Sequence, residues 1–247
     1  MGSGFKSFQP NTVLTASDVQ GYLQDQAVMS FATGAARGSA ITSPVEGMPS
    51  YLANSNRFQI YNGAVWQSYT PGLVPVSPTS VDYSGGAAPT VSAMGEVIGS
   101  GKTGLSLNGV FTSAFRNYRV LIWTVGSTTH DVSFRLRAGT DSIASYNWTS
   151  VAGNFNVLGR GVGNNTTEFQ IGTATTSIKY TVLEFTRPAE VVPTVVLGES
   201  STYNANGTEI VHLGGLHNVT AAYDGLSILT FAGNLTIIAQ VFGYNHN

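Results

Sequence analysis

The sequence predicts a mainly β protein. A C-terminal antiparallel β-sandwich, jelly-roll-like, is preceded by a short N-terminal helix, a small β-hairpin module and an extended linker. Two observations lead to this class. Segments after residue 95 alternate between apolar and polar residues, as Phe134 and Leu136 alternate with Ser133 and Arg135. Turns rich in Gly and Asn separate these segments at the spacing of a β-sandwich.

Residues 12–41 contain the one segment with helical spacing. Thr15 and Asp18 fit a capping arrangement, and apolar residues follow on one helical face at Val19, Tyr22 and Leu23. The Ala- and Gly-rich stretch 31–41 either continues this helix or forms a second short one.

The period changes to that of strands between residues 47 and 69. Segments 48–52 and 57–61 form a predicted hairpin, and Asn62-Gly63 turns the chain into a third strand at 64–68. A meander of this size buries little surface alone, so we expect it to pack on the helix or on other copies of the chain. Tyr61 and Trp66 are expected in its core. Residues 1–69 thus form the predicted N-terminal module.

Residues 70–95 carry four prolines among Gly, Ser, Thr and Ala, and proline removes a backbone donor wherever it occurs. We therefore expect an extended linker here, with the sandwich spanning 96–247. Its clearest strands are predicted at 115–125, 132–137, 168–171, 177–185, 191–197, 209–213, 225–231 and 235–244. Trp123, midway through the first of these, is expected in the core.

Composition excludes several classes of function. The formal net charge is −2, and the 11 basic residues are scattered, so neither nucleic acid nor an anionic membrane is an expected partner. The absence of cysteine removes disulfides, thiol catalysis and Cys-based zinc sites. No apolar run approaches the roughly 18 residues that span a bilayer. No cofactor is expected.

The segment 98–104, IGSGKTG, approaches the phosphate-binding loop pattern. Gly101, Lys102 and Thr103 fit, but Glu96 occupies the place of the first glycine. Leu105 and the residues after it alternate with period two, whereas a phosphate loop is followed by a helix. We expect Lys102 to be a solvated turn residue between two strands.

Two groups of segments resemble virion proteins of tailed bacteriophages. TVLTASDV (12–19), YLQDQAVM (22–29), AAR (35–37), PVEGM (44–48) and YNGAVW (61–66) resemble the start of minor tail proteins and tail fibres, chiefly of phages infecting actinobacteria. VFTS (110–113), NYRV (117–120), FRLR (134–137), YDGL (223–226) and VFGYN (241–245) are similar to the terminal β-sandwich of such fibres.

This resemblance implies a structural virion protein that acts in receptor binding. Residues 1–69 would attach to other virion proteins, and the sandwich would face a host-surface glycan, usually as a homotrimer. Repeated weak contacts would add up to firm attachment. The tail is the expected location, and a head fibre or capsid decoration protein is the alternative.

The best predicted glycan site is the segment at Tyr146, Asn147, Trp148 and Thr149, where aromatic faces and polar groups could meet sugar rings. Tyr203 and Asn204 are a weaker second site. The alternative is that Tyr146 and Trp148 share one strand face and pack in the core.

We expect no catalytic residues. A polysaccharide depolymerase, the second alternative, would need paired carboxylates, and the spacing of the 13 acidic residues reveals no pair. His212 and His217 flank a glycine turn and are expected at the surface or a subunit contact rather than on a metal. The cluster Arg116, Arg119, Arg135 and Arg137 would pair with carboxylates across a subunit interface or contact an anionic polymer.

Overall fold

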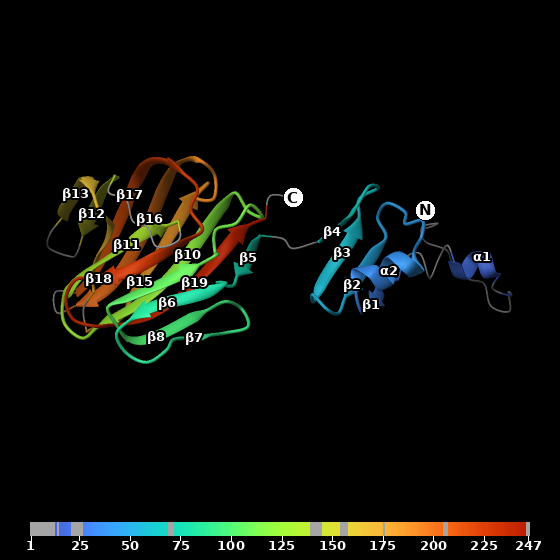
Figure 1. Ribbon diagram of the computed structural model, residues 1–247, viewed down its shortest axis with the longest axis horizontal. Coiled ribbons are helices and arrows are strands. Elements are labelled where there is room, and N and C mark those ends of the chain that lie inside the picture. Colours follow the sequence, from blue (N-terminus) through green and yellow to red (C-terminus); the bar gives the residue numbers. More distant parts are fainter. Residues whose placement is uncertain are drawn as a thin grey trace. The chain divides into compact units, whose positions relative to one another are not determined.

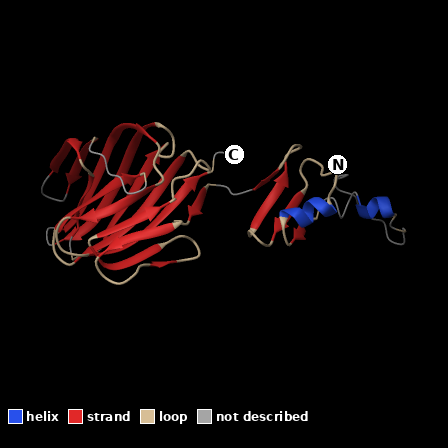
Figure 2. Cartoon of the chain, viewed as in Figure 1, coloured by secondary structure: helices blue, strands red, loops and turns tan. Residues whose placement is uncertain are grey.

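The computed structural model describes residues 13, 15–20, 27–68, 72–138, 145–153, 158–174, 176–204 and 207–245. It divides the chain into two compact units, Met1–Pro71 and Gly72–Asn247. Strands dominate both units, as Figure 2 shows, and the predicted mainly β class is confirmed. The two described helices belong to the first unit.

The first unit contains α1 (Ala16–Val19), β1 (Met29–Phe31), α2 (Gly34–Ala40), β2 (Pro49–Leu52), β3 (Arg57–Tyr61) and β4 (Trp66–Ser68). The predicted capping arrangement is confirmed, because Asp18 N–H donates to the Thr15 hydroxyl and Thr15 N–H donates to the Asp18 carboxylate. Tyr22 and Leu23 lie outside the described residues.

The first unit folds around a four-stranded sheet in the order β1-β2-β3-β4. The predicted antiparallel meander is confirmed in β2, β3 and β4. Phe31 is not helical; it ends β1, which pairs parallel with β2. The second short helix, α2, starts at Thr33, whose hydroxyl accepts from Ala36 N–H at 3.1 Å.

Arg37 of α2 lies at the centre of this small unit. It is buried, and its Nη1 donates to Ser50 Oγ at 3.0 Å and to Gln59 Oε1. Its guanidinium lies 4.1 Å from the centroid of the Trp66 ring. Tyr61 and Trp66 pack together as expected, with ring centroids 5.4 Å apart, but both are only half-buried.

The second unit contains fifteen described strands. They are β5 (Leu73–Val76), β6 (Ser80–Ser84), β7 (Thr90–Val91), β8 (Val97–Lys102), β9 (Gly104–Asn108), β10 (Asn117–Gly126), β11 (His130–Arg137), β12 (Tyr146–Gly153), β13 (Leu158–Thr166), β14 (Phe169–Ala174), β15 (Lys179–Thr186), β16 (Val192–Asn204), β17 (Gly207–Ala221), β18 (Gly225–Thr230) and β19 (Leu235–Tyr244).

The strands form two facing sheets (Figure 1). One is ten-stranded, in the order β13-β12-β17-β16-β15-β10-β19-β8-β7 with β5 also on β19, and the other runs β14-β11-β18-β9-β6. Eight strands follow the jelly-roll order, in which β8, β19, β10 and β15 face β9, β18, β11 and β14. The hairpins β12–β13 and β16–β17 extend the larger sheet beyond that plan.

The prediction of an extended linker over 70–95 is wrong. Three of its segments are strands of the sandwich, because β5 pairs with β19, β6 with β9 and β7 with β8. Pro75 lies within β5, which pairs with one neighbour only, and a strand of that kind tolerates a residue without an N–H. The boundary between the units is at residues 71–72 rather than 95–96.

The core lies between the two sheets. Val120 and Ile122 of β10 face Phe134 and Leu136 of β11, and all four are almost fully buried. Trp123 occupies the opposite face of β10, half-buried on the outside of the larger sheet, where its ring centroid lies 5.0 Å from that of Tyr180. The prediction that Trp123 is a core residue is therefore wrong.

The segment IGSGKTG runs from β8 into β9, so the prediction of a strand on each side is confirmed and no helix follows Thr103; the two strands belong to different sheets. Lys102 is not solvated. It is fully buried, and its Nζ donates to the carbonyl oxygens of Gly85, at 2.9 Å, and of Ala87. The same Nζ lies 4.2 Å from the centroid of the Tyr83 ring. Lys102 thus holds the loop between β6 and β7.

Candidate glycan-binding face

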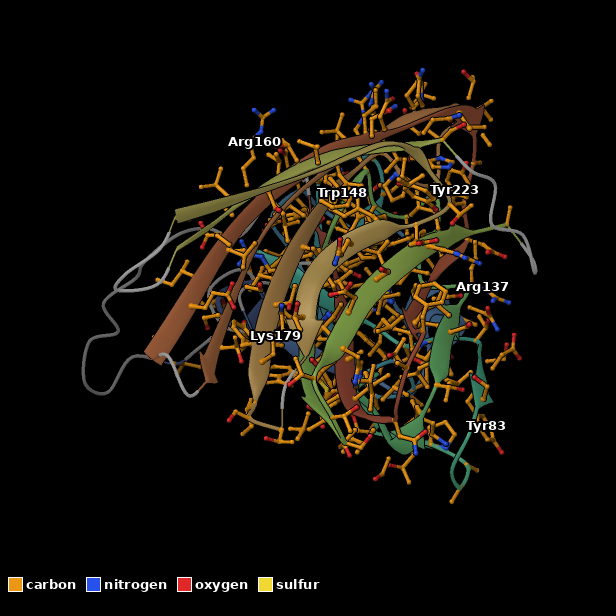
Figure 3. All side chains as sticks on the ribbon, turned by 90° about the vertical axis from the view of Figure 1, so that its left-hand side faces the viewer. Tyr83, Arg137, Trp148, Arg160, Lys179 and Tyr223 are labelled. Atoms are coloured by element: carbon orange, nitrogen blue, oxygen red, sulfur yellow. The ribbon has the colours of Figure 1, made fainter. Side chains whose placement is uncertain are left out.

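The best predicted glycan site does not form as a unit. Tyr146 is fully buried, and its hydroxyl accepts a hydrogen bond from Leu136 N–H at 2.7 Å. Trp148, on the same face of β12, packs on the core with its ring centroid 6.3 Å from that of Phe169. Tyr146 and Trp148 therefore follow the alternative interpretation, packing inward (Trp148 is labelled in Figure 3), and the buried Tyr146 cannot offer its ring to a sugar.

Asn147 and Thr149 lie on the outer face of the larger sheet, because they alternate with Tyr146 and Trp148 along β12. The Asn147 side-chain carbonyl accepts from Asn165 N–H at 3.0 Å, and Thr149 is exposed. The four predicted residues thus divide between two faces of the sheet.

The second predicted site, Tyr203 and Asn204, lies at the end of β16. Their backbones pair with Thr208 and Gly207 of β17. Their side chains lie outside the described part of the structure, so the second glycan site stays a prediction.

His212 and His217 also point to opposite faces. His212 is exposed, and its Nδ1 lies 3.1 Å from Glu199 Oε1. His217 is buried, where its Nδ1 lies 2.8 Å from the Tyr223 hydroxyl and its ring 4.2 Å from that of Tyr146. The expectation of a surface position is wrong for His217. The described residues include no group of three or more side chains that could hold a metal ion.

The four arginines do not form one cluster. Arg119 lies in β10 of the larger sheet and Arg116 directly precedes that strand. Arg135 and Arg137 belong to β11 of the smaller sheet. Each pairs with a carboxylate of its own chain, in the pairs Arg116–Glu190, Arg119–Glu184, Arg135–Glu168 and Arg137–Asp82. The carboxylates that these arginines pair with are thus intramolecular.

The outer surface of the five-stranded sheet carries a continuous set of polar side chains, which we call the polar face. Its members are Asp82, Ser106, Asn108, Arg135, Arg137, Glu168 and Ser227. The register places Asp82 beside Ser106, Ser106 beside Ser227 and Ser227 beside Arg135. Outward positions on four adjacent strands thus supply one polar row.

Arg137 connects the strands of the polar face. Its Nη1 donates to Ser106 Oγ and to Ser227 Oγ, each at 3.0 Å, and its Nη2 lies 3.1 Å from Asp82 Oδ2. Asn108 Nδ2 donates to the same atom, Asp82 Oδ2, at 3.0 Å. Arg137 thus lies on the outside of the sandwich (Figure 3), where its guanidinium is hydrogen-bonded to both β9 and β18.

An aromatic ring stands at the other end of the polar face. Phe231, the residue after β18, is 64% exposed. The Arg135 guanidinium lies 6.0 Å from the centroid of this ring and also bonds Glu168 at 3.2 Å. An exposed ring beside fixed donors and acceptors is the combination that binds a sugar, because the ring covers the apolar face and the polar groups meet the hydroxyls.

Sequence reasoning missed this face for two reasons. Asp82 lies in a segment whose composition predicts a linker. Asn108 ends β9 and Phe231 follows β18, and these two strands pair although they are distant in sequence. One signal was present: Ser133, Arg135 and Arg137 alternate with apolar residues, so one side of that strand had to be polar.

A second polar group lies on the outer face of the larger sheet. The Glu184 carboxylate accepts from Arg119 and from the Tyr244 hydroxyl, the latter at 2.7 Å. The hydrogen bond to Glu184 raises the pKa of Arg119, and burial, then the same carboxylate, raises the pKa of Tyr244. Glu184 is therefore a structural anchor between β15, β10 and β19.

Neither a protein-family model nor a curated protein matches this chain. Within the described residues, no helix has the length and apolar character needed to cross a membrane.

Proposed function

We propose that this chain is a non-enzymatic structural virion protein of a tailed bacteriophage, a tail fibre or tail spike that adheres to a host-surface glycan. The observation that carries the adhesive function is the polar face, where Asp82, Asn108 and Arg137 form one network and Arg135 lies beside the exposed ring of Phe231 at the other end. Side chains that are already fixed lose little entropy on binding. The virion assignment rests on the sequence resemblance to minor tail proteins.

The division of the chain supports separate tasks for its two units. The first unit has its own sheet and its own centre at Arg37, and it includes the segments that resemble fibre N-termini. Residues 1–69 attach to other virion proteins in this proposal, and the second unit meets the host.

Self-association as a homotrimer is part of the proposal. Five exposed apolar residues lie on neighbouring strands of the larger sheet's outer face, which we call the apolar patch: Val151, Val162, Val195, Leu197 and Ile210. They surround the exposed Glu199–His212 pair, and exposed apolar residues gathered on one sheet face favour contact with another protein.

The trimer is tested by light scattering. The measured mass should be about three times the 25.9 kDa of one chain, and Leu197→Asp should lower that mass. A wild-type mass near one chain contradicts the trimer.

Glycan binding is tested with cell-wall polysaccharide from an actinobacterium, immobilised on a sensor. Asp82→Asn and Phe231→Ala change exposed members of the site, and each should weaken binding about tenfold. Glu199→Gln and Val191→Ala are matched controls, being an exposed carboxylate and an exposed apolar residue elsewhere. An equal loss of affinity in the control variants, or no loss in the site variants, would show that the polar face does not bind the glycan.

The same incubations address the depolymerase alternative. Saturable binding without release of reducing ends supports the adhesin, whereas their release establishes an enzyme. Antibody labelling of intact particles tests the location. Label on the tail supports the proposal, whereas label on capsid vertices supports the alternative of a head fibre or capsid decoration protein.

A further inference from the structure

We propose that a groove on the outer face of the larger sheet binds a small organic cation with a trimethylammonium group. The groove has a volume of about 210 Å³ and lies over β10, β15 and β19 beside the start of β8. It is lined mainly by Trp123, Val125, Ile178 and Ile238, with Thr236 and Glu96 supplying polar atoms. It shares no residue with the polar face or the apolar patch.

The walls of the groove match the apolar surface of a methylated cation. Ile178 is 65% exposed, so the isoleucine side chain lines the groove without being covered by its own chain. Drug-sized ligands occupy pockets of roughly 300–1,000 Å³. The smaller volume here suits a single headgroup.

Trp123 supplies an aromatic surface for the positive charge. Indole is the best of the protein rings for cation–π contact, and it attracts a cation most strongly where water is displaced. The ring is positioned by Tyr180, whose centroid lies 5.0 Å away at an interplanar angle of 45°. This pairing leaves the ring half-buried at the wall of the groove.

Glu96 is the one charged residue that lines the groove. Within the described part of the chain, its carboxylate takes part in no ion pair or hydrogen bond. Its backbone is held in a turn, because Ser92 N–H donates to Glu96 C=O at 2.8 Å and the Ser92 hydroxyl accepts from Glu96 N–H at 3.1 Å. Gln240 Nε2 ties this turn to β19 by donating to Met94 C=O at 3.1 Å. The turn thus fixes the backbone of an acidic residue that lines an apolar, aromatic groove.

The groove suits a cation better than a neutral sugar. A sugar would need several hydrogen-bonding partners, and the Thr236 hydroxyl is already paired with Ser100 Oγ at 3.2 Å. Trimethylammonium has no donor to satisfy, and it needs only an apolar wall, an aromatic face and a nearby anion. All three are present.

The test is a titration of the full chain with choline chloride, followed by NMR of the Trp123 indole N–H. A saturable shift of that signal is expected, with Trp66 and Trp148 unaffected. The neutral isostere 3,3-dimethylbutan-1-ol should bind about fivefold more weakly, because it has the same shape and no charge. Equal affinity for the two compounds overturns the proposal.

Variants complete the test. Glu96→Gln should weaken choline binding about fivefold, and Trp123→Ala about tenfold or more. Trp123→Phe keeps a ring and should give an intermediate loss, which separates loss of the aromatic face from loss of fold. Glu199→Gln, an exposed carboxylate on the same sheet face, should leave binding unchanged. Absent choline binding, binding only to phosphatidylcholine vesicles, or a groove covered by a second copy each overturns the inference.

Discussion

Lys102 shows how a buried ammonium group can organise a loop. Its Nζ donates to the carbonyl oxygens of Gly85 and Ala87 and faces the Tyr83 ring, so Lys102→Met would leave two carbonyl groups without their donor. We expect a loss of about 2 kcal/mol in the free energy of unfolding. Denaturant titration measures it. Arg160→Met, at an exposed position, should change little, and an unchanged Lys102→Met variant would contradict the role assigned to Lys102.

The buried Lys179 should make the stability of the fold depend on pH. Burial lowers its pKa from 10.5 to about 8, and Glu209 and Asp131 only partly oppose this shift. Below pH 8 both the folded and unfolded states carry the proton, so the full cost of the buried charge, about 3 kcal/mol, is present. Between pH 8 and 10.5 the unfolded state holds more protons, so stability rises with pH.

Lys179→Met removes the titrating group. The variant should therefore be more stable than the wild type at pH 7, and this advantage should shrink at pH 10. Chemical denaturation of both proteins at both pH values measures the difference, while other titrating groups cancel. A difference that does not change with pH would mean that the Lys179 pKa is not lowered.

At the residue scale, the sequence predicts that side chains alternate between the two faces of a strand, but not which face meets the core. Residues 120–123 of β10 form an uninterrupted apolar run, so alternation could not tell that Ile122 faces the core and Trp123 faces outward. The same limit applies to Tyr146 and Trp148. Their shared face was predictable from their spacing, but only the facing sheet shows that it is the inner one.

At the element scale, strands with strong alternation were predictable and weakly patterned ones were not. The segments that became β10, β11, β15, β18 and β19 carry long apolar periods. In contrast, β5, β6 and β7 are short and lie among Pro, Gly, Ser and Thr residues, and β5 pairs with β19, which is distant along the chain. Local composition then indicates a linker, because nothing local records a distant hydrogen-bonded partner.

The hairpin of β12 and β13 depends on glycine at one position. Gly163 lies opposite Trp148, and an added Cβ there would overlap the indole Nε1. Gly163→Ala should therefore destabilise the second unit by about 1–3 kcal/mol. Gly159→Ala is the matched control in the same strand, because its Cβ would meet nothing closer than 4.0 Å. Thermal melts that give the two variants equal stability would contradict this packing.

At the scale of the molecule, the two sheets of the second unit differ in the chemistry of their outer faces. The smaller sheet presents hydroxyl, amide and ionic groups that bond one another, whereas the larger presents exposed apolar residues such as Leu197 and Ile210 in addition to the bonded group around Glu184. A polar surface suits reversible contact with a hydrated glycan, and an apolar surface suits contact between subunits. This contrast links the fold to the proposed adhesive function.

The boundary between the units gives the last prediction. A fragment of residues 72–247 retains every strand of the sandwich and should unfold in one cooperative transition, close to that of the second unit in the full chain. A fragment of residues 96–247 lacks β5, β6 and β7, so it exposes the edge of β9 and removes the carbonyl partners of Lys102. It also removes Val76 and Val81, which pack on the core. It should be less stable by about 3 kcal/mol or more, if it folds. Denaturant unfolding of both fragments measures this difference, and equal stability would show that residues 72–95 are dispensable.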